Sequence, residues 1–193
     1  WIYYCSASSV PLPDSIRQLR YSLCRIAFDA DHGTWGDRVD TLWNARLEKG
    51  SVCHPKASPD GRYLLYTVAD YGTFPIWHRE TELQLMDLRT GAVDSLPMVN
   101  SDRSDTYHSW SSGSRWFAFA SKRGDGQYGR VYFAYLDADG KAHKPFVLPQ
   151  SDPEKDDLTL KSYNIPDLSA TPVPFDASSI KRINRQLKAE EFK

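Results

Sequence analysis

Two segments of the chain, residues 68–82 and 100–110, are rich in aromatic and charged side chains. Aromatic planes can stack on the apolar face of a sugar or peptide, and charged groups beside them can orient such a ligand. Arg103 could pair with a ligand carboxylate, and Asp105 could orient His108 if their side chains lie within ~3.2 Å. We therefore expect ligand contacts from six residues: Tyr71, Trp77, His78, Arg103, Asp105 and His108.

A structural interpretation of the same residues competes with the binding hypothesis. Trp77 and Phe74 could fasten a long loop onto its own sheet, and Asp105 and His108 could form a purely structural hydrogen bond. On that interpretation at least half of the six residues would be buried in loop packing. Aromatic and charged side chains serve both purposes in proteins, so the two interpretations remain open at the level of sequence.

Other patterns that could support catalysis or metal binding are weak. The five histidines lie in separate segments without an HxH or HxxxH pair, and Cys5, Cys24 and Cys53 lack CxxC spacing, so no metal site is predicted. A disulfide between Cys5 and Cys24 across neighbouring strands stays open. Acidic pairs such as Asp137 and Asp139 are typical of hairpin turns, and no G-x-S-x-G nucleophile motif occurs. We therefore assign no catalytic residue and no cofactor.

Composition narrows the class of protein that must position these residues. The 193 residues carry 24 Lys and Arg against 25 Asp and Glu, a net charge of -1 that argues against a nucleic-acid partner. No apolar run approaches the ~20 residues of a membrane-spanning helix. Aromatic residues reach 13%, and such residues favour strands. An all-β globular fold is expected.

An internal repeat indicates which all-β fold this is. Residues 57–67, ASPDGRYLLYT, align with residues 110–120, WSSGSRWFAFA, at an offset of 53, and WIYYCSAS at residues 1–8 aligns with the strand part of both. Each copy is followed by a variable loop, a second strand, an acidic or glycine turn and a short strand. Antiparallel strands that repeat about every 50 residues are typical of propeller blades.

The repeat divides the chain into a partial propeller and an extension. Residues 1–150 are expected to hold three consecutive four-stranded blades at about 1–45, 46–98 and 99–150, of which the first lacks its first strand. Three blades are too few to close a ring, so we expect a partner, either the remaining half of the same propeller or a symmetry mate. Residues 151–193 form a C-terminal extension.

The extension is expected to contain one short helix at 177–191. Asp176 is a plausible N-cap for this helix. Ile180, Ile183 and Leu187 would share one face of it. Its basic residues are expected to be solvated rather than to bind a membrane or nucleic acid.

Specific residues of the repeat resemble a known family. Ser58–Thr67 resembles the S-P-D-G repeat of TolB-like, or WD-like repeat, β-propellers, and Ser121–Gly126 resembles the S-x-R-x-G turn of the same family. Leu85–Gly91 resembles its third strand and turn. The resemblance covers about residues 1–150. As a whole, the chain also resembles the TolB-like proteins of Bacteroidetes of unknown function. The second copy departs from the motif at Ser112–Ser114, which leaves its turn type open.

The resemblance implies a six-bladed ring, usually periplasmic, that binds proteins or small ligands. In a propeller, the loops between second and third strands share one face with the loops between blades, so residues 68–82 and 100–110 should be neighbours. We therefore expect a non-enzymatic binding or scaffolding propeller of the cell envelope, with a protein, small molecule or glycan as ligand. The alternative is a polysaccharide-acting enzyme, similar to a metal-assisted lyase, that uses the same face.

Overall fold

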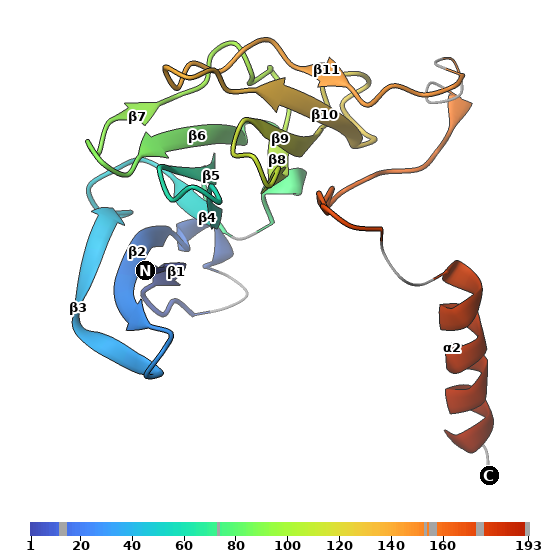
Figure 1. Ribbon diagram of the computed structural model, residues 1–193, viewed down its shortest axis with the longest axis horizontal. Coiled ribbons are helices and arrows are strands. Elements are labelled where there is room, and N and C mark those ends of the chain that lie inside the picture. The colour runs from blue at the N-terminus through green and yellow to red at the C-terminus, as the bar shows by residue number, and fades with distance from the viewer. Residues whose placement is uncertain (12–14, 73, 153, 155–157, 173–175, 192–193) are drawn as a thin grey trace.

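The chain folds as three consecutive antiparallel sheets, the blades of a β-propeller, followed by an extension (Figure 1). The computed structural model describes residues 1–11, 15–72, 74–152, 154, 158–172 and 176–191, and of residues 177 and 187–191 it describes the backbone alone. The first sheet has the order β1 (Ile2–Ala7), β2 (Tyr21–Asp29), β3 (Thr34–Trp43). The second has β4 (Ser51–Ala57), β5 (Tyr63–Ala69), β6 (Glu82–Asp87), β7 (Val93–Asp94). The third has β8 (Asp105–Trp110), β9 (Trp116–Ser121), β10 (Arg130–Tyr135), β11 (Phe146–Val147).

Strand pairing confirms the predicted all-β class with two full four-stranded blades. Each sheet pairs its strands in chain order, as hairpins between consecutive strands produce. The first sheet has three strands because β1 occupies the place of β5 and β9, the second position in a blade. Its third strand, β3, is ten residues long, whereas β7 and β11 have two residues each.

The second sheet is buried on both faces, which explains its nearly continuous apolar sequence. Leu65 pairs with Leu85, and both pack against Phe117 and Phe119 of the third sheet. Leu64 pairs with Met86, one residue along, and these two pack with Leu23 and Tyr66 on the side of the first sheet. Successive strand residues point to opposite faces, so one strand contributes to two cores. The sheets therefore stack in the order first, second, third.

The two copies of the repeated turn share their backbone hydrogen bonds despite their different sequences. In the first copy the Gly61 amide donates to the Ser58 carbonyl at 2.8 Å, and in the second the Ser114 amide donates to the Ser111 carbonyl at 3.0 Å. Gly61 has φ +71° and Ser114 has φ +57°. Ser114 thus adopts the left-handed conformation that glycine takes in the S-P-D-G copy. The turn that the sequence left open in the second copy therefore closes with the same backbone hydrogen bond as the first, and its last residue has the same left-handed φ.

The three cysteines are free thiols in the structure. Cys5 pairs with Leu23 and Cys24 with Tyr4, so the two cysteines are out of register on neighbouring strands. A disulfide requires Cβ atoms about 3.8 Å apart, which directly facing residues provide. The Cys5–Cys24 disulfide that the sequence left open is absent.

The extension leaves the third sheet and ends in α2 (Ala177–Glu191), which Figure 1 shows apart from the sheets. Asp176 Oδ1 accepts a hydrogen bond from the Ser179 amide at 2.8 Å, as an N-cap does. Ile180 and Ile183 are exposed, and the side chain of Leu187, expected on the same face, lies outside the described residues. Among the described helices none is long and apolar enough to span a membrane.

Candidate functional site

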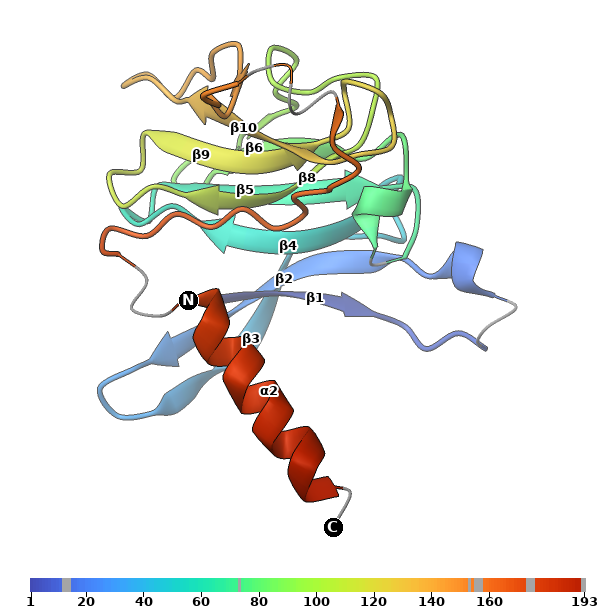
Figure 2. The same cartoon turned by 90° about the vertical axis from the view of Figure 1, so that its right-hand side faces the viewer.

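The candidate site lies where three loops meet at one end of the second and third sheets. These are the loop from β5 to β6, which contains the 3-10 turn η2 (Pro75–Trp77), the loop from β7 to β8, and the loop from β9 to β10. Figure 2 shows η2 in green at the right-hand end of the sheets, beside the loop that leaves β9. A pocket of about 200 Å³ lies between the loops and is lined by Ile76, Trp77, His78, Arg79, Arg103, Ser104, Lys122 and Gly126.

Trp77 is held on a hydrogen-bonded turn and is nevertheless 81% exposed. Its amide donates to the Phe74 carbonyl at 3.0 Å, which closes the turn. The Pro75 carbonyl accepts hydrogen bonds from Thr81 Oγ1 at 2.7 Å and from Ser104 Oγ, in the next loop, at 3.1 Å. Both hydroxyls are buried, so these bonds are shielded from competing water. The backbone of the turn is therefore anchored by buried hydrogen bonds, while the indole of Trp77 is exposed to solvent.

Three cationic side chains line the same pocket as the indole: Arg79, Arg103 and Lys122. Lys122 Nζ lies 5.4 Å from the centroid of the Trp77 ring, within cation–π distance. Arg79 donates from Nε to the Asp102 carbonyl and from Nη2 to Asp102 Oδ2, both at 3.0 Å. Arg103 Nε lies 3.7 Å from the same carboxylate oxygen. The loops from β5 and β7, predicted to be neighbours, are thus in direct contact through Arg79 and Asp102.

Gly126 leaves room for the Arg103 side chain. Its φ of +76° is in the left-handed region, and a Cβ added there would lie 3.4 Å from Arg103 Nε. This glycine belongs to the S-x-R-x-G segment, so the motif contributes to the site through its backbone.

His78 and Tyr71 extend the site toward the first sheet. Their rings meet edge to face with centroids 4.4 Å apart, and His78 Nδ1 lies 3.1 Å from Glu80 Oε1. The guanidinium groups of Arg17 and Arg20 lie about 6 Å from the Tyr71 ring. Tyr71 is half-buried, and the His78 side chain is only 12% exposed, so the two rings support the loop and leave part of their surface accessible.

Asp105 is placed in the protein interior, away from the pocket. It is 0% exposed, and its Oδ1 accepts a 2.8 Å hydrogen bond from Arg123 Nη2. Its Oδ2 accepts from the Ser101 amide at 2.6 Å and from Ser101 Oγ at 2.8 Å. The carboxylate therefore joins the β7–β8 loop to the loop that follows β9.

His108 is buried as well and does not pair with Asp105. Its Nε2 lies 2.8 Å from the Leu65 carbonyl, which can only accept, so Nε2 carries the proton. Burial, with a smaller contribution from the positive charge of Lys56, lowers the pKa of His108 to about 3. The sequence-based expectation that Asp105 orients His108 is wrong, because each side chain is committed to another partner.

The structural interpretation of the loops is wrong for Trp77 and Phe74. Both side chains are exposed, and η2 is instead fastened by Pro75 and Ile76, which are buried. Of the six expected site residues, Trp77, His78 and Arg103 line one pocket, Tyr71 contacts His78, and Asp105 and His108 lie in the core.

Sequence reasoning missed the contribution of Lys122. Lys122 belongs to the segment that resembles the S-x-R-x-G turn. That resemblance does not indicate that Lys122, directly after its strand, lies beside the β5–β6 loop. The offset of 53 could have indicated this, because it places Lys122 and Ala69 at the same end of successive blades.

The innermost strands contain a second feature that the sequence did not predict. His54 and Tyr107, at the same position in successive repeats, have φ values of +53° and +48°. Each lies at a register shift of its strand, and their rings are 4.8 Å apart. Bulges of this type turn a side chain out of the regular alternation of a strand. Here they bring an imidazole and a phenol together between the second and third blades.

The thiols of Cys5 and Cys53 are poor nucleophiles. Burial raises the pKa of Cys5 to about 12 and that of Cys53 to about 11, so both thiols stay protonated at neutral pH. Within the described ranges no group of three or more His, Cys, Asp or Glu side chains is arranged to hold a metal ion.

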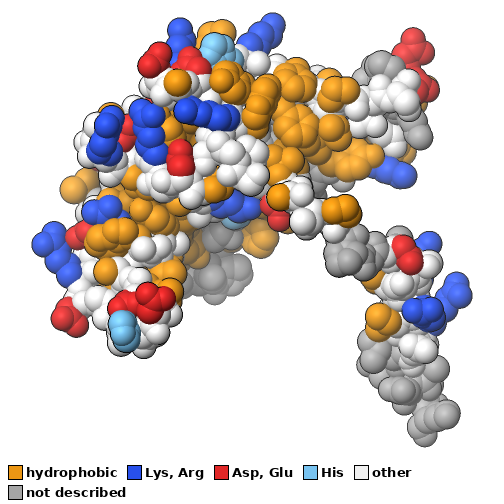
Figure 3. All heavy atoms as spheres, in the orientation of Figure 1, with side chains coloured by type: hydrophobic (Ala, Val, Ile, Leu, Met, Phe, Trp, Pro, Cys, Tyr) orange, Lys and Arg blue, Asp and Glu red, His pale blue; other side chains and the backbone are white. Residues whose placement is uncertain are grey.

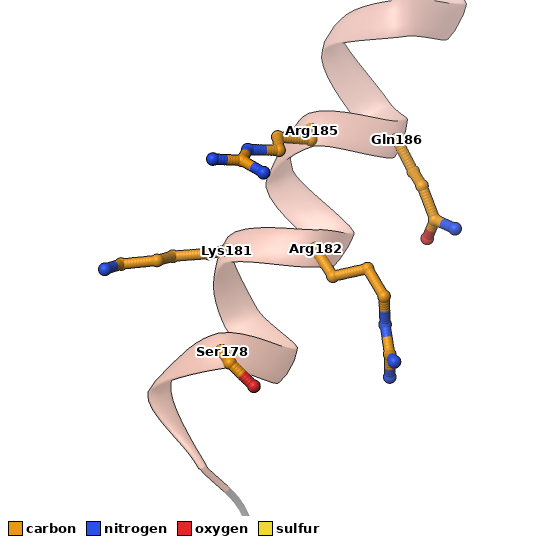
Figure 4. Close-up of a pocket in the computed structure, with 5 residues that line it drawn as sticks. All are labelled: Ser178, Lys181, Arg182, Arg185 and Gln186. Atoms are coloured by element: carbon orange, nitrogen blue, oxygen red, sulfur yellow. The ribbon is translucent and has the colours of Figure 1, made fainter.

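Another depression on the molecule lies along α2 (Figure 4). It is lined by Ser178, Lys181, Arg182, Arg185 and Gln186. Figure 4 shows these side chains projecting in different directions from a single helix. A site enclosed from one side only offers a ligand little burial, so the Trp77 pocket remains the candidate site.

Comparisons with known proteins find likeness among solved structures. No protein-family model and no curated protein matches the chain. Among solved structures, the chain is similar to the crystal structure of TolB from Acinetobacter baumannii, with a TM-score of 0.44 and 16% sequence identity over 67% of this chain. The chain spans 27% of the length of that TolB protein.

Proposed function

We propose that the chain is part of a non-enzymatic binding or scaffolding propeller of the cell envelope, which recognises a protein or small ligand at the Trp77 pocket. The observation that carries this proposal is an exposed indole on an anchored turn, in a pocket that is also lined by Arg79, Arg103 and Lys122. A large exposed aromatic side chain has unburied apolar area that a ligand can cover at ~25 cal/mol per Å². A turn fixed before binding also reduces the entropy lost on association.

Loss of the indole tests this function. The Trp77→Ala variant and a control, Trp35→Ala, are compared with the wild type on defined peptide and glycan arrays. Trp35 is also exposed but lies in β3 of the first sheet. The proposal expects at least one binder that is lost with Trp77→Ala and retained with Trp35→Ala. Binders that survive Trp77→Ala, or arrays without any binder, contradict it.

The second part of the proposal is that a further blade covers the outer face of the third sheet. Trp116, Phe133 and Phe146 lie on the face of this sheet opposite to Phe117, and their rings contact one another, with Trp116–Phe146 at 6.0 Å and Phe133–Phe146 at 5.9 Å. Figure 3 shows hydrophobic side chains gathered over β10 and β11. The other face of the same sheet packs on a blade, so the occupant we propose is another antiparallel blade, from the remaining half of the ring.

Sedimentation tests this second part. The chain alone should self-associate through the uncovered face, and Phe146→Lys should make it monomeric while the fold is retained by circular dichroism. A wild-type chain that is well folded and monomeric at all concentrations contradicts a missing blade.

Location in the cell envelope rests on the resemblance of Ser58–Thr67 to the TolB-like repeat. Fractionation of cells that produce the natural protein tests it. Recovery in the envelope fraction supports the location, and recovery with cytoplasmic markers contradicts it.

A further inference from the structure

We infer that the ligand of the Trp77 pocket is an acidic peptide segment of a partner protein, with a carboxylate held between Arg103 and Lys122 and an adjoining apolar group on the indole. This inference rests on the proposed function, because it specifies the ligand of the same site. Its first basis is charge: three of the eight lining residues are cationic and none is acidic.

Asp102 shows that the arginine pair accepts a carboxylate. This residue, which does not line the pocket, places Oδ2 3.0 Å from Arg79 Nη2 and 3.7 Å from Arg103 Nε. Its side chain is 72% exposed, so solvent screens the contact and its contribution to stability is small. A carboxylate of the protein itself therefore occupies part of the position that a ligand carboxylate would take. Asp102 is a competitor that a bound acid must partly displace.

Lys122 provides the cation that Asp102 does not neutralise. Its ammonium group lies over the Trp77 ring, and in the described part of the chain no carboxylate oxygen comes within 4.0 Å of it. An ammonium group above an indole favours an anion that can contact it from the solvent side. A ligand with a carboxylate next to an apolar group satisfies both the cation and the ring.

The dimensions of the pocket favour a side chain of a protein over a free small acid. Small-molecule sites usually have about 300–1,000 Å³ and enclose most of the ligand. The Trp77 pocket has about 200 Å³, enough for a protruding side chain. Tryptophan and arginine are also the residue types that most often dominate the binding energy of protein interfaces. These features together point to a partner protein that inserts an aspartate or glutamate.

Paired peptides test the inference. An array of short peptides that contain Glu or Asp is probed beside matched peptides in which Gln or Asn replaces the acids. The best acidic peptide is then titrated by fluorescence anisotropy against the wild type and against Lys122→Glu, Asp102→Asn and Lys144→Glu. Lys144→Glu is the matched control, because Lys144 is exposed in the loop that follows β10, outside the pocket.

The expected result is a clear ranking of affinities. Lys122→Glu should raise the Kd about tenfold, and Asp102→Asn, which removes the competitor, should lower it about threefold. Lys144→Glu should have little effect. High salt should weaken binding of the acidic peptide, and the matched amide peptide should bind weakly at any ionic strength. Free glutamate or galacturonate at millimolar concentration should not displace the peptide.

Three outcomes would overturn the acidic-peptide inference. These are equal binding of the acidic and amide peptides, equal effects of Lys122→Glu and Lys144→Glu, and displacement by free galacturonate, which would indicate an acidic glycan. In each case the binding can still depend on Trp77, and the proposed function then stands. If the best peptide binds Trp77→Ala as well as the wild type, the proposed function itself fails.

Discussion

At the scale of residues, the distinction between structural and ligand-binding groups depends on partners more than on residue type. Asp105 and His108 have the chemistry of a site but are buried, and each is bonded to protein groups. Trp77 is less reactive, yet it is the side chain that the fold leaves uncovered. The types and spacing of the residues predicted which segments of the chain would contribute to the candidate site. They could not predict partners, because Arg123 reaches Asp105 through the pairing of β9 with β8, and Leu65 reaches His108 only when the second and third sheets stack.

Replacement of Asp105 should destabilise the protein strongly. Asp105→Asn leaves the Arg123 guanidinium, which is only 19% exposed, without its carboxylate. Removing one partner of a buried ion pair costs about 3–5 kcal/mol, and the partial exposure of Arg123 places the expected loss near 3 kcal/mol. Urea unfolding measures it. Asp102→Asn is the control, and a similar change in the two variants would contradict the structural role of Asp105.

Acidification should reveal the neutral state of His108. Its pKa is about 3 in the folded protein and close to 6.5 when unfolded, so below pH 6.5 the unfolded chain binds a proton that the folded chain does not. This contribution leaves stability unchanged above pH 6.5 and reduces it progressively as the pH falls toward 3. Between pH 7 and pH 5 the resulting loss in the free energy of unfolding is about 2 kcal/mol.

Urea unfolding of wild type and His108→Gln at both pH values isolates this effect. The variant can still donate a hydrogen bond to the Leu65 carbonyl and has no titrating ring. It should lose about 2 kcal/mol less than the wild type on acidification. Equal losses would show that His108 is not held neutral in the folded state.

At the scale of elements, the repeat of 53 residues predicted the strands well because backbone pattern is local. Apolar runs at residues 63–69 and 116–121 and the turns before them are encoded within a few residues. The left-handed backbone of Ser114, His54 and Tyr107 was not predicted, because serine, histidine and tyrosine seldom adopt it. Hydrogen bonding imposes it on Ser114 from the turn, and register shifts accompany it in the innermost strands.

Glycine substitutions in the two copies of the turn should differ in effect. Gly61 and Gly113 both have open space where a Cβ would be added, but only Gly61 has a positive φ, +71°. Gly61→Ala should therefore cost about 1 kcal/mol of unfolding free energy through backbone strain, and Gly113→Ala should be nearly neutral. Thermal unfolding compares them. Equal effects would contradict the assigned backbone of the turn.

At the scale of the whole molecule, the second sheet couples its neighbours because each of its faces belongs to a different core. Leu64 packs toward the first sheet and Leu65 toward the third, although they are consecutive residues of β5. Composition and repeat predicted the blades. The alternation of side chains along β5 and the stacking order of the sheets together determine which core each residue packs into. The sequence does not state the stacking order.

Truncation of each of these two leucines should destabilise a different core. Leu64→Ala and Leu65→Ala each remove a fully buried side chain and should each cost about 2–5 kcal/mol. Native-state hydrogen exchange should show the larger loss of protection in β2 for Leu64→Ala and in β9 for Leu65→Ala. The same pattern in both variants would contradict the two-core arrangement.

The central claim is that ligand binds at the Trp77 pocket, and the indole N–H signals of the six tryptophans test it most directly. Each signal is assigned by substitution and followed by NMR during titration with the best acidic peptide. The account predicts that the Trp77 signal shifts in a saturable manner together with the amides of residues 76–79, 102–104 and 122–126. Saturable shifts at Trp116 or Trp110 with Trp77 unchanged would contradict it.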